Sequence, residues 1–230
     1  MEPTWAYGWM IVQGAGWTLA LVLTVIPVGL LLGLMGAAAK LSPFAPLRWV
    51  ADGYTTFIRG IPELLIIFLV FFGGSRALMW LLEGLGLPDV RIDINPFVAG
   101  VIALGLVQGG FATEVFRAAI QSVPRGQIEA AEACGFTRWQ VFRHVTLPQV
   151  WRIALPSLGN LLQILIKDTA LISVVGLADI MRNAQIGAGA TKEPFTFLLM
   201  AGVLYLMITT VATTGITLME KRANRAYRRA

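Results

Sequence analysis

The stretch Ile11–Met35 reads IVQGAGWTLALVLTVIPVGLLLGLM and carries no charged side chain. The hydrocarbon core of a bilayer is about 30 Å thick, and a helix of roughly 20 apolar residues crosses it while satisfying its own backbone hydrogen bonds. Ile11–Met35 is therefore predicted to be a membrane-spanning helix. Pro27 has no N–H to donate, so we expect it to kink that helix.

Four more stretches pass the same test of length and polarity: Leu64–Leu82, Ile94–Thr113 with an extension toward Ile120, Ile153–Ala178, and Pro194–Met219. Leu64–Leu82 is interrupted by two glycines and by Arg76, whose long side chain can reach the headgroups. Ile153–Ala178 contains Lys167 and Asp168, which are costly in lipid unless they are paired or hydrated. The sequence thus predicts an all-α integral membrane protein with five transmembrane helices in a single domain, 1–230.

The basic residues are distributed unequally between the two sides that five spans define. Thirteen lie on one side: Lys40, Arg48, Arg59, Arg117, Arg125, Arg138, Arg143, Arg152, Lys221, Arg222, Arg225, Arg228 and Arg229. Four lie on the other: Arg76, Arg91, Arg182 and Lys192. Positive charge collects on the cytoplasmic side, so the N-terminus is predicted outside and the basic tail 220–230 inside. The Met1-Glu2-Pro3 start lacks the basic residues of a cleavable signal peptide, so it should remain in the protein.

The composition excludes several other classes of protein. The chain is 57% hydrophobic and only 13% charged, and its net charge of +5 comes without a nucleic-acid-binding motif. One histidine, His144, and one cysteine, Cys134, leave no cluster for a metal site or a catalytic triad. No phosphate-binding Gly-x-x-x-x-Gly-Lys-Ser/Thr loop is present. We therefore expect no metal, no cofactor and no ATP hydrolysis in this chain.

The segment between the third and fourth spans, 124–148, is longer than a connector needs. Gln127–Cys134 is rich in helix formers and stops at Gly135, a residue that takes the left-handed conformation easily. Thr137 can cap a second helix, with Gln140 completing a capping box, and Pro148 should limit that helix at its far end. The segment is predicted to form two short helices with a sharp turn between them.

This helix pair permits two interpretations on physical grounds. Three alanines, Ala130, Ala131 and Ala133, would let another protein approach the first helix closely. Glu129 and Glu132 are expected in the first turns of that helix, where the helix dipole favours carboxylates and a basic partner could meet them. Alternatively, the segment could lie on the lipid surface through Trp139 and Phe142.

A family resemblance favours the first interpretation. Glu129-Ala130-Ala131, Gly135, Val145 and Leu147-Pro148 occur at a spacing that resembles the EAA motif of ABC importer permeases, with valine at the usual isoleucine position. Three further segments are similar to the polar amino-acid branch of that family, especially permeases for histidine, lysine, arginine, ornithine and opines: Gly53–Pro62, Glu114 with Arg117, and Lys167–Leu171. The resemblance implies a type I ABC importer transmembrane domain in the bacterial inner membrane. It also implies that Glu129, Ala130, Ala131, Glu132 and Gly135 belong to a coupling helix that sits in a cleft of a separate ATPase.

The same resemblance implies the partners. Five helices are too few to enclose a transport path, so we expect a second permease subunit, either homologous or identical. Two copies of an ABC ATPase would hold ATP and Mg, and an external binding protein would deliver an amino acid. The chain itself would break no bond.

Polar residues recur along one face of the fourth span. Asn160, Gln163 and Lys167 follow at helical spacing, and Ser157 extends the row. This face could join helices through hydrogen bonds, or it could line the substrate path. Lys167 would then face the substrate's α-carboxylate, unless it is permanently paired with Asp168 or Glu114. Either of these two carboxylates could attract the side-chain cation of a basic amino acid, although Glu114 can also form a structural pair with Arg117.

Two rival classes remain. An ATPase-independent channel or secondary transporter would leave the 124–148 segment without a function. A membrane-bound enzyme would need a convergent set of reactive groups, for which the sequence offers one histidine and one cysteine.

Overall fold

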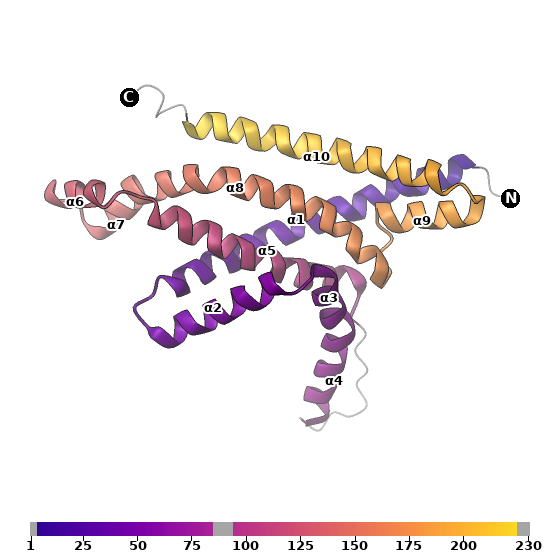
Figure 1. Cartoon of the computed structure of the whole chain (residues 1–230), viewed down its shortest axis with the longest axis horizontal. Helices are drawn as coiled ribbons and strands as arrows, with labels where there is room; N and C mark the ends of the chain where they lie inside the picture. Colours follow the sequence, from indigo (N-terminus) through magenta and orange to yellow (C-terminus); the bar gives the residue numbers. More distant parts are fainter. Residues whose placement is uncertain (1–3, 85–93, 225–230) are drawn as a thin grey trace.

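The computed structural model describes residues 4–84 and 94–224, and in these ranges every regular element is a helix (Figure 1). The Met1-Glu2-Pro3 start, Arg91, and residues 225–230 of the basic tail lie outside the described residues. The elements in chain order are α1 (Thr4–Lys40), α2 (Ala45–Gly60), α3 (Glu63–Phe68), the π-helix η1 (Leu69–Gly73), α4 (Gly74–Gly84), α5 (Pro96–Gln121), α6 (Arg125–Ala133), α7 (Arg138–Val141), the π-helix η2 (Phe142–Thr146), α8 (Leu147–Asp168), the 3₁₀-helix η3 (Thr169–Val175), α9 (Ile180–Thr191) and α10 (Pro194–Asn224).

The five predicted spans are confirmed as helical segments long and apolar enough to cross a membrane: Tyr7–Lys40, Glu63–Gly84, Pro96–Gln121, Arg138–Val175 and Pro194–Asn224. Pro27 lies inside α1 without ending it. The first of the two glycines in the second span, Gly73, is the last residue of the π-helix η1, and the second, Gly74, begins α4. Two of the five spans are therefore series of helical segments rather than uniform α-helices.

The centre of the molecule is the close packing of α1 against α5, which small residues permit. A Cβ on Gly33 of α1 would stand 2.5 Å from the Cβ of Ala112 on α5, and a Cβ on Gly109 would stand 2.6 Å from the Cβ of Leu32. Side chains at either glycine would force the helices apart. Since lipid tails are as apolar as a leucine side chain, this intimate contact is what holds membrane helices together.

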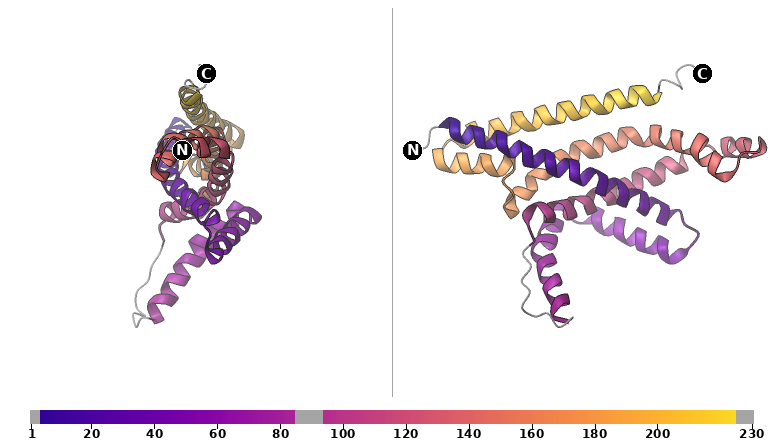
Figure 2. Two further views of the ribbon diagram at one scale, coloured as in Figure 1. Left: turned by 90° about the vertical axis from the view of Figure 1, so that its left-hand side faces the viewer. Right: turned by 180° about the vertical axis from the view of Figure 1, so that it is seen from behind.

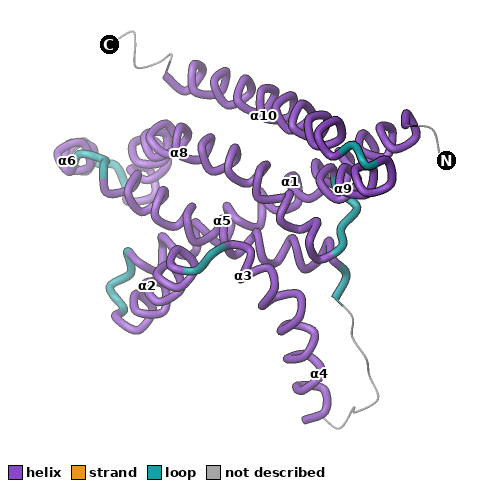
Figure 3. Tube along the Cα trace, turned by 45° about the vertical axis from the view of Figure 1, so that its right-hand side comes forward, coloured by secondary structure: helices purple, strands orange, loops and turns teal. Residues whose placement is uncertain are grey.

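The long helices α1, α5, α8 and α10 run roughly along one axis, whereas α3 packs against the bundle at a steep angle to them and α4 projects away from it (Figures 1 and 2). None of the residues of α4 is buried. The helix pair α6 and α7 projects from one end of the bundle, and the chain begins at the opposite end. Figure 3 shows that the described loops are short connections between helices. Which end faces the cytoplasm stays a prediction from charge.

The far boundary predicted for the second loop helix is wrong. Helix continues from α7 through η2 into α8, and Pro148 occupies the first turn of α8. Pro148 does not interrupt the chain of helical segments because η2 already departs from the α-helical hydrogen-bond pattern just before it.

Candidate functional site

The turn at Gly135 has the geometry that its sequence predicts. Gly135 has a φ of 84°, its N–H donates to the carbonyl of Glu132 at 2.9 Å, and the N–H of Phe136 donates to the carbonyl of Ala131 at 3.1 Å. This pair of hydrogen bonds is the Schellman motif, which satisfies carbonyls at the end of α6. The predicted left-handed turn is thereby confirmed.

The start of α7 is fixed by a capping box, as predicted. The backbone N–H of Gln140 donates to Thr137 Oγ1 at 3.4 Å, and the backbone N–H of Thr137 donates to Gln140 Oε1 at 2.8 Å. A further hydrogen bond joins α6 to α8, because Gln149 Nε2 donates to Gln127 Oε1 at 2.7 Å. The orientation of α6 relative to α8 is thus set by specific bonds at both ends of the turn.

The surface of this projecting pair is uncovered. Every residue from 132 to 140 is exposed, and so are Glu129 and Ala130, whereas Ala131 is half-buried. The large apolar side chains of Phe136 and Trp139 are 41% and 64% exposed, and the Trp139 ring stacks on that of Phe142. An exposed apolar surface carried on rigid, well-capped elements is typical of a docking site for another molecule.

The expected position of the two glutamates is wrong. α6 begins at Arg125, directly after Pro124, so its first turn holds no acidic residue. Glu129 lies in the middle of α6 and Glu132 lies in its last turn. The helix dipole therefore does not stabilise these carboxylates, and both are free to form ion pairs with another molecule.

At the same end of the bundle, Glu114 takes part in an ion network that joins three helices. Its Oε1 lies 2.6 Å from Lys40 Nζ, and its Oε2 lies 2.7 Å from Arg117 Nη2. Lys40 Nζ also lies 2.8 Å from Asp52 Oδ1 on α2. The predicted Glu114–Arg117 pair is confirmed, whereas the alternative pairing of Glu114 with Lys167 is wrong, because Lys40 occupies that carboxylate.

The Lys40–Glu114 contact should stabilise the fold measurably, since only 10% and 20% of the two side chains are exposed. We expect a double-mutant cycle with Lys40→Met and Glu114→Gln, measured by thermal unfolding, to give a coupling energy of about 1–3 kcal/mol. Asp52→Asn is the control, since Asp52 is 60% exposed and its pair should contribute less than about 1 kcal/mol. Additive effects of the two substitutions would contradict this role.

The polar face of α8, defined by Ser157, Asn160, Gln163 and Lys167, is not covered by other helices of this chain. Ser157, Asn160 and Lys167 are exposed and Gln163 is half-buried. Within the described ranges none of the four makes a side-chain hydrogen bond or a salt bridge. The polar face of α8 therefore does not join helices within the subunit, and it must face water, substrate or a second subunit.

Asp168 ends α8, and the chain then tightens into η3 and turns at Gly176, which has a φ of 103°. Asp168 is half-buried, and its Oδ2 has no hydrogen-bond partner among the described residues. The charge of Glu63, at the start of α3, acts on this carboxylate. Sequence reasoning missed Glu63, because 105 positions separate it from Asp168 and no local pattern connects them.

A buried carboxylate that sequence reasoning also missed lies beside the N-terminal half of α1. Asp179 is fully buried and caps α9, with its Oδ1 accepting from the N–H of Arg182 at 2.8 Å. Its Oδ2 has no hydrogen-bond partner in the described part of the chain. Burial raises the pKa of Asp179 to about 6, although backbone N–H groups and the nearby Tyr205 hydroxyl act in the opposite direction.

This raised pKa predicts a specific pH dependence of stability. The unfolded carboxyl titrates near pH 4, so its stabilising contribution is present below about pH 4 and is lost as the pH rises through 6. The asparagine in Asp179→Asn can still cap α9 but cannot ionise, so this variant should not lose stability as the pH rises. Thermal unfolding between pH 4.5 and 7.5 measures the difference, which should reach up to about 3 kcal/mol in the free energy of unfolding. Glu129→Gln, at an exposed site, is the matched control. Parallel pH profiles of wild type and Asp179→Asn would contradict the prediction.

Comparison with known proteins places the whole chain in one group. It is 48% identical to the nopaline transport system permease protein of Agrobacterium fabrum, over 96% of this chain and 94% of the relative. It is 42% identical to the histidine/lysine/arginine/ornithine transport system permease protein of Escherichia coli, over 98% of both chains. A crystal structure of an amino acid ABC transporter with histidines matches with a TM-score of 0.80 at 33% identity, covering 94% of this chain and 95% of that chain.

The family model for the inner membrane component of binding-protein-dependent transport systems matches residues 25–225. The matched region includes the last four of the five spans, the C-terminal part of the first span, and the whole projecting helix pair. The two relatives extend the match to 96% and 98% of the chain. The chain belongs to the family of inner membrane components of binding-protein-dependent transport systems.

Proposed function

We propose that this chain is the permease subunit of an ATP-driven importer of basic amino acids or related opines, and that its projecting helix pair docks on a separate ATPase. The observation that carries the proposal is the rigid Gly135 turn, which presents an exposed apolar and acidic surface at the end of the bundle. Relatives named for transport of nopaline and of histidine, lysine, arginine and ornithine support the substrate class.

The docking contact would involve Glu129, Ala130, Ala131, Glu132 and Gly135. Glu129 and Glu132 project from the middle and end of α6 as exposed carboxylates, which suits a basic cleft. Phe136 and Trp139 add apolar area that a partner would bury. ATP and Mg would bind to the ATPase, since this chain carries no phosphate-binding loop.

The substrate path would run along the polar face of α8. Lys167 is exposed on this face and would meet the α-carboxylate of the substrate. Asp168 and Glu63, whose charges act on each other, would attract the side-chain cation of a basic amino acid. Glu114 is no candidate for this role, because Lys40 and Arg117 already neutralise it.

A second permease subunit would complete the path. Whereas α3 packs on the core of this chain through Ile66 and Ile67, α4 projects from the bundle without a buried residue, so a second subunit would have room to pack on α4. Two ATPases and an external binding protein would complete the assembly in the bacterial inner membrane. ATP-driven approach of the ATPases would move both helix pairs together and switch the helices between outward-open and inward-open states.

Reconstitution into liposomes tests the proposal. We expect uptake of labelled arginine when the chain is reconstituted with its ATPase, its second subunit and the binding protein, with ATP inside. Replacing the ATPase by a variant that binds but does not hydrolyse ATP should reduce uptake to background. Uptake that persists without the ATPase would instead identify a channel or secondary transporter. Uptake of glutamate but not of arginine or nopaline would overturn the substrate class.

A further inference from the structure

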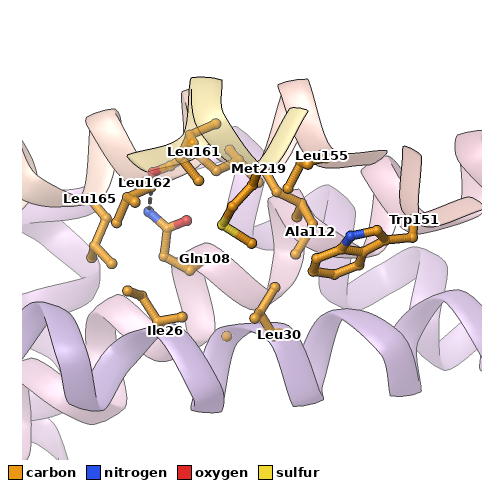
Figure 4. Close-up of a pocket in the computed structure, with 13 residues that line it drawn as sticks. Ile26, Leu30, Gln108, Ala112, Trp151, Leu155, Leu161, Leu162, Leu165 and Met219 are labelled. Atoms are coloured by element: carbon orange, nitrogen blue, oxygen red, sulfur yellow. Dashed lines mark hydrogen bonds between the residues drawn. The ribbon is translucent and has the colours of Figure 1, made fainter. Parts of the chain in front are cut away.

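A cavity of about 250 Å³ lies between α1, α5, α8 and α10 (Figure 4). Its wall is almost entirely hydrocarbon, with Leu30, Leu158, Leu162 and Met219 among the lining side chains. Gln108 is the polar residue in the lining, and its Nε2 is already committed to the carbonyl of Leu161 at 3.4 Å. The cavity therefore suits an apolar occupant that needs no hydrogen bond.

This cavity is separate from the proposed substrate path. The α8 residues that line it, such as Leu155 and Leu162, lie on one side of the helix. At roughly 100° per residue, Asn160 and Lys167 lie on the opposite side. A polar amino acid that follows the polar face of α8 would not meet the cavity, which is partly open and lies within the apolar segments of the bundle.

The cavity extends toward the end of the bundle that carries α6 and α7. Trp151, in the first turns of α8, lines it at that end, and Met219, near the end of α10, projects into its middle (Figure 4). Tryptophan is typical of the boundary between the hydrocarbon core and the headgroups. Arg222 is exposed and follows Met219 by three residues, so it lies about one helical turn beyond the part of α10 that lines the cavity.

The charges at this end of the cavity indicate which kind of apolar molecule would bind there. The last described turn of α10 holds Glu220, Lys221 and Arg222, so two positive charges outweigh one negative charge. An arginine binds a phosphate through two parallel hydrogen bonds, and basic clusters beside a span attract anionic lipids. We propose that the cavity binds one acyl chain of an anionic phospholipid, whose phosphate contacts Arg222. Such a lipid would fill the gap between α1 and α10 from the leaflet next to α6 and α7.

A photo-crosslinking experiment tests this site. The full-length chain, with the subunits that accompany it, is placed in nanodiscs containing phosphatidylglycerol that carries a diazirine in one acyl chain. We expect labelling of the peptides that hold Leu158, Leu162 and Met219. Arg222→Gln should lower this labelling roughly fivefold, the change expected from removing one basic contact to an anionic lipid. Lys221→Gln, in the same turn but directed farther from the cavity, is the matched control and should lower it less.

A second pair of variants tests the cavity itself. Met219→Trp should fill the middle of the cavity and reduce labelling at Leu158 and Leu162, whereas Leu218→Trp, on a neighbouring exposed position outside the cavity, should leave it unchanged. Equal labelling by phosphatidylcholine with the same diazirine chain would overturn the headgroup assignment. Labelling spread evenly over the apolar helices, or unaffected by Met219→Trp, would overturn the site. Neither result bears on amino-acid uptake, which is measured separately.

Discussion

Replacing Gly135 with valine is expected to abolish ATP-driven uptake while leaving the chain inserted in the membrane. Gly135 has a φ of 84°, where a β-branched side chain is strained by about 1–3 kcal/mol. The added side chain would meet open space, so the strain comes from the backbone, and it would be relieved by turning α6 relative to α7 at the expense of the Schellman hydrogen bonds. The five spans do not depend on this turn, so insertion should be normal.

The measurement is ATP hydrolysis and substrate uptake by the same reconstituted complex. We expect ATP hydrolysis to continue while uptake falls by roughly tenfold or more. This result is expected when the coupling free energy between the ATPase and the substrate path is lost. Gly126→Val is the matched control, since Gly126 is also exposed and unobstructed but its φ is not positive. Full uptake by Gly135→Val, or an equal loss in Gly126→Val, would show that the turn does not transmit the movement.

The sequence was sufficient where the physical cause is local. Apolar length predicts each span, because a lipid-facing helix must satisfy its own backbone. The Gly135 turn and the Thr137 capping box follow from residues within five positions of each other. The prediction that Pro148 ends the second loop helix is wrong, because the π-helix η2 before it already changes the hydrogen-bond pattern that a proline normally breaks.

Contacts between distant segments could not be predicted in the same way. Lys40 and Glu114 are 74 positions apart, and only the packing of α1 on α5 brings them to 2.6 Å. The burial of Asp179 likewise depends on Gly14, where a Cβ would stand 2.6 Å from the Asp179 backbone. Neither contact produces a local sequence pattern. Each residue is ordinary among its neighbours in the sequence, and its role becomes visible only when its neighbours in space are known.

The exposed lysine on α8 carries the second large prediction. Lys167→Met should reduce uptake of a basic amino acid by roughly tenfold or more, because a charge-assisted hydrogen bond to the substrate's α-carboxylate is lost. Assembly should be unaffected, since Lys167 makes no hydrogen bond or salt bridge in the described part of the chain. Uptake kinetics at several substrate concentrations should show that the apparent affinity falls.

Lys167→Arg provides the conservative comparison, because it keeps the charge and should recover much of the uptake that methionine loses. Co-purification of the other subunits with each variant separates transport from assembly. If Lys167→Met released the second subunit, the lysine would be an interface residue, and the exposure of the polar face of α8 in the isolated chain would reflect a missing protein contact. If uptake were unchanged, the substrate would not pass along this face. Asp168 and Glu63 would then lack the neighbouring positive charge needed to bind the α-carboxylate of an amino acid whose side-chain cation they attract.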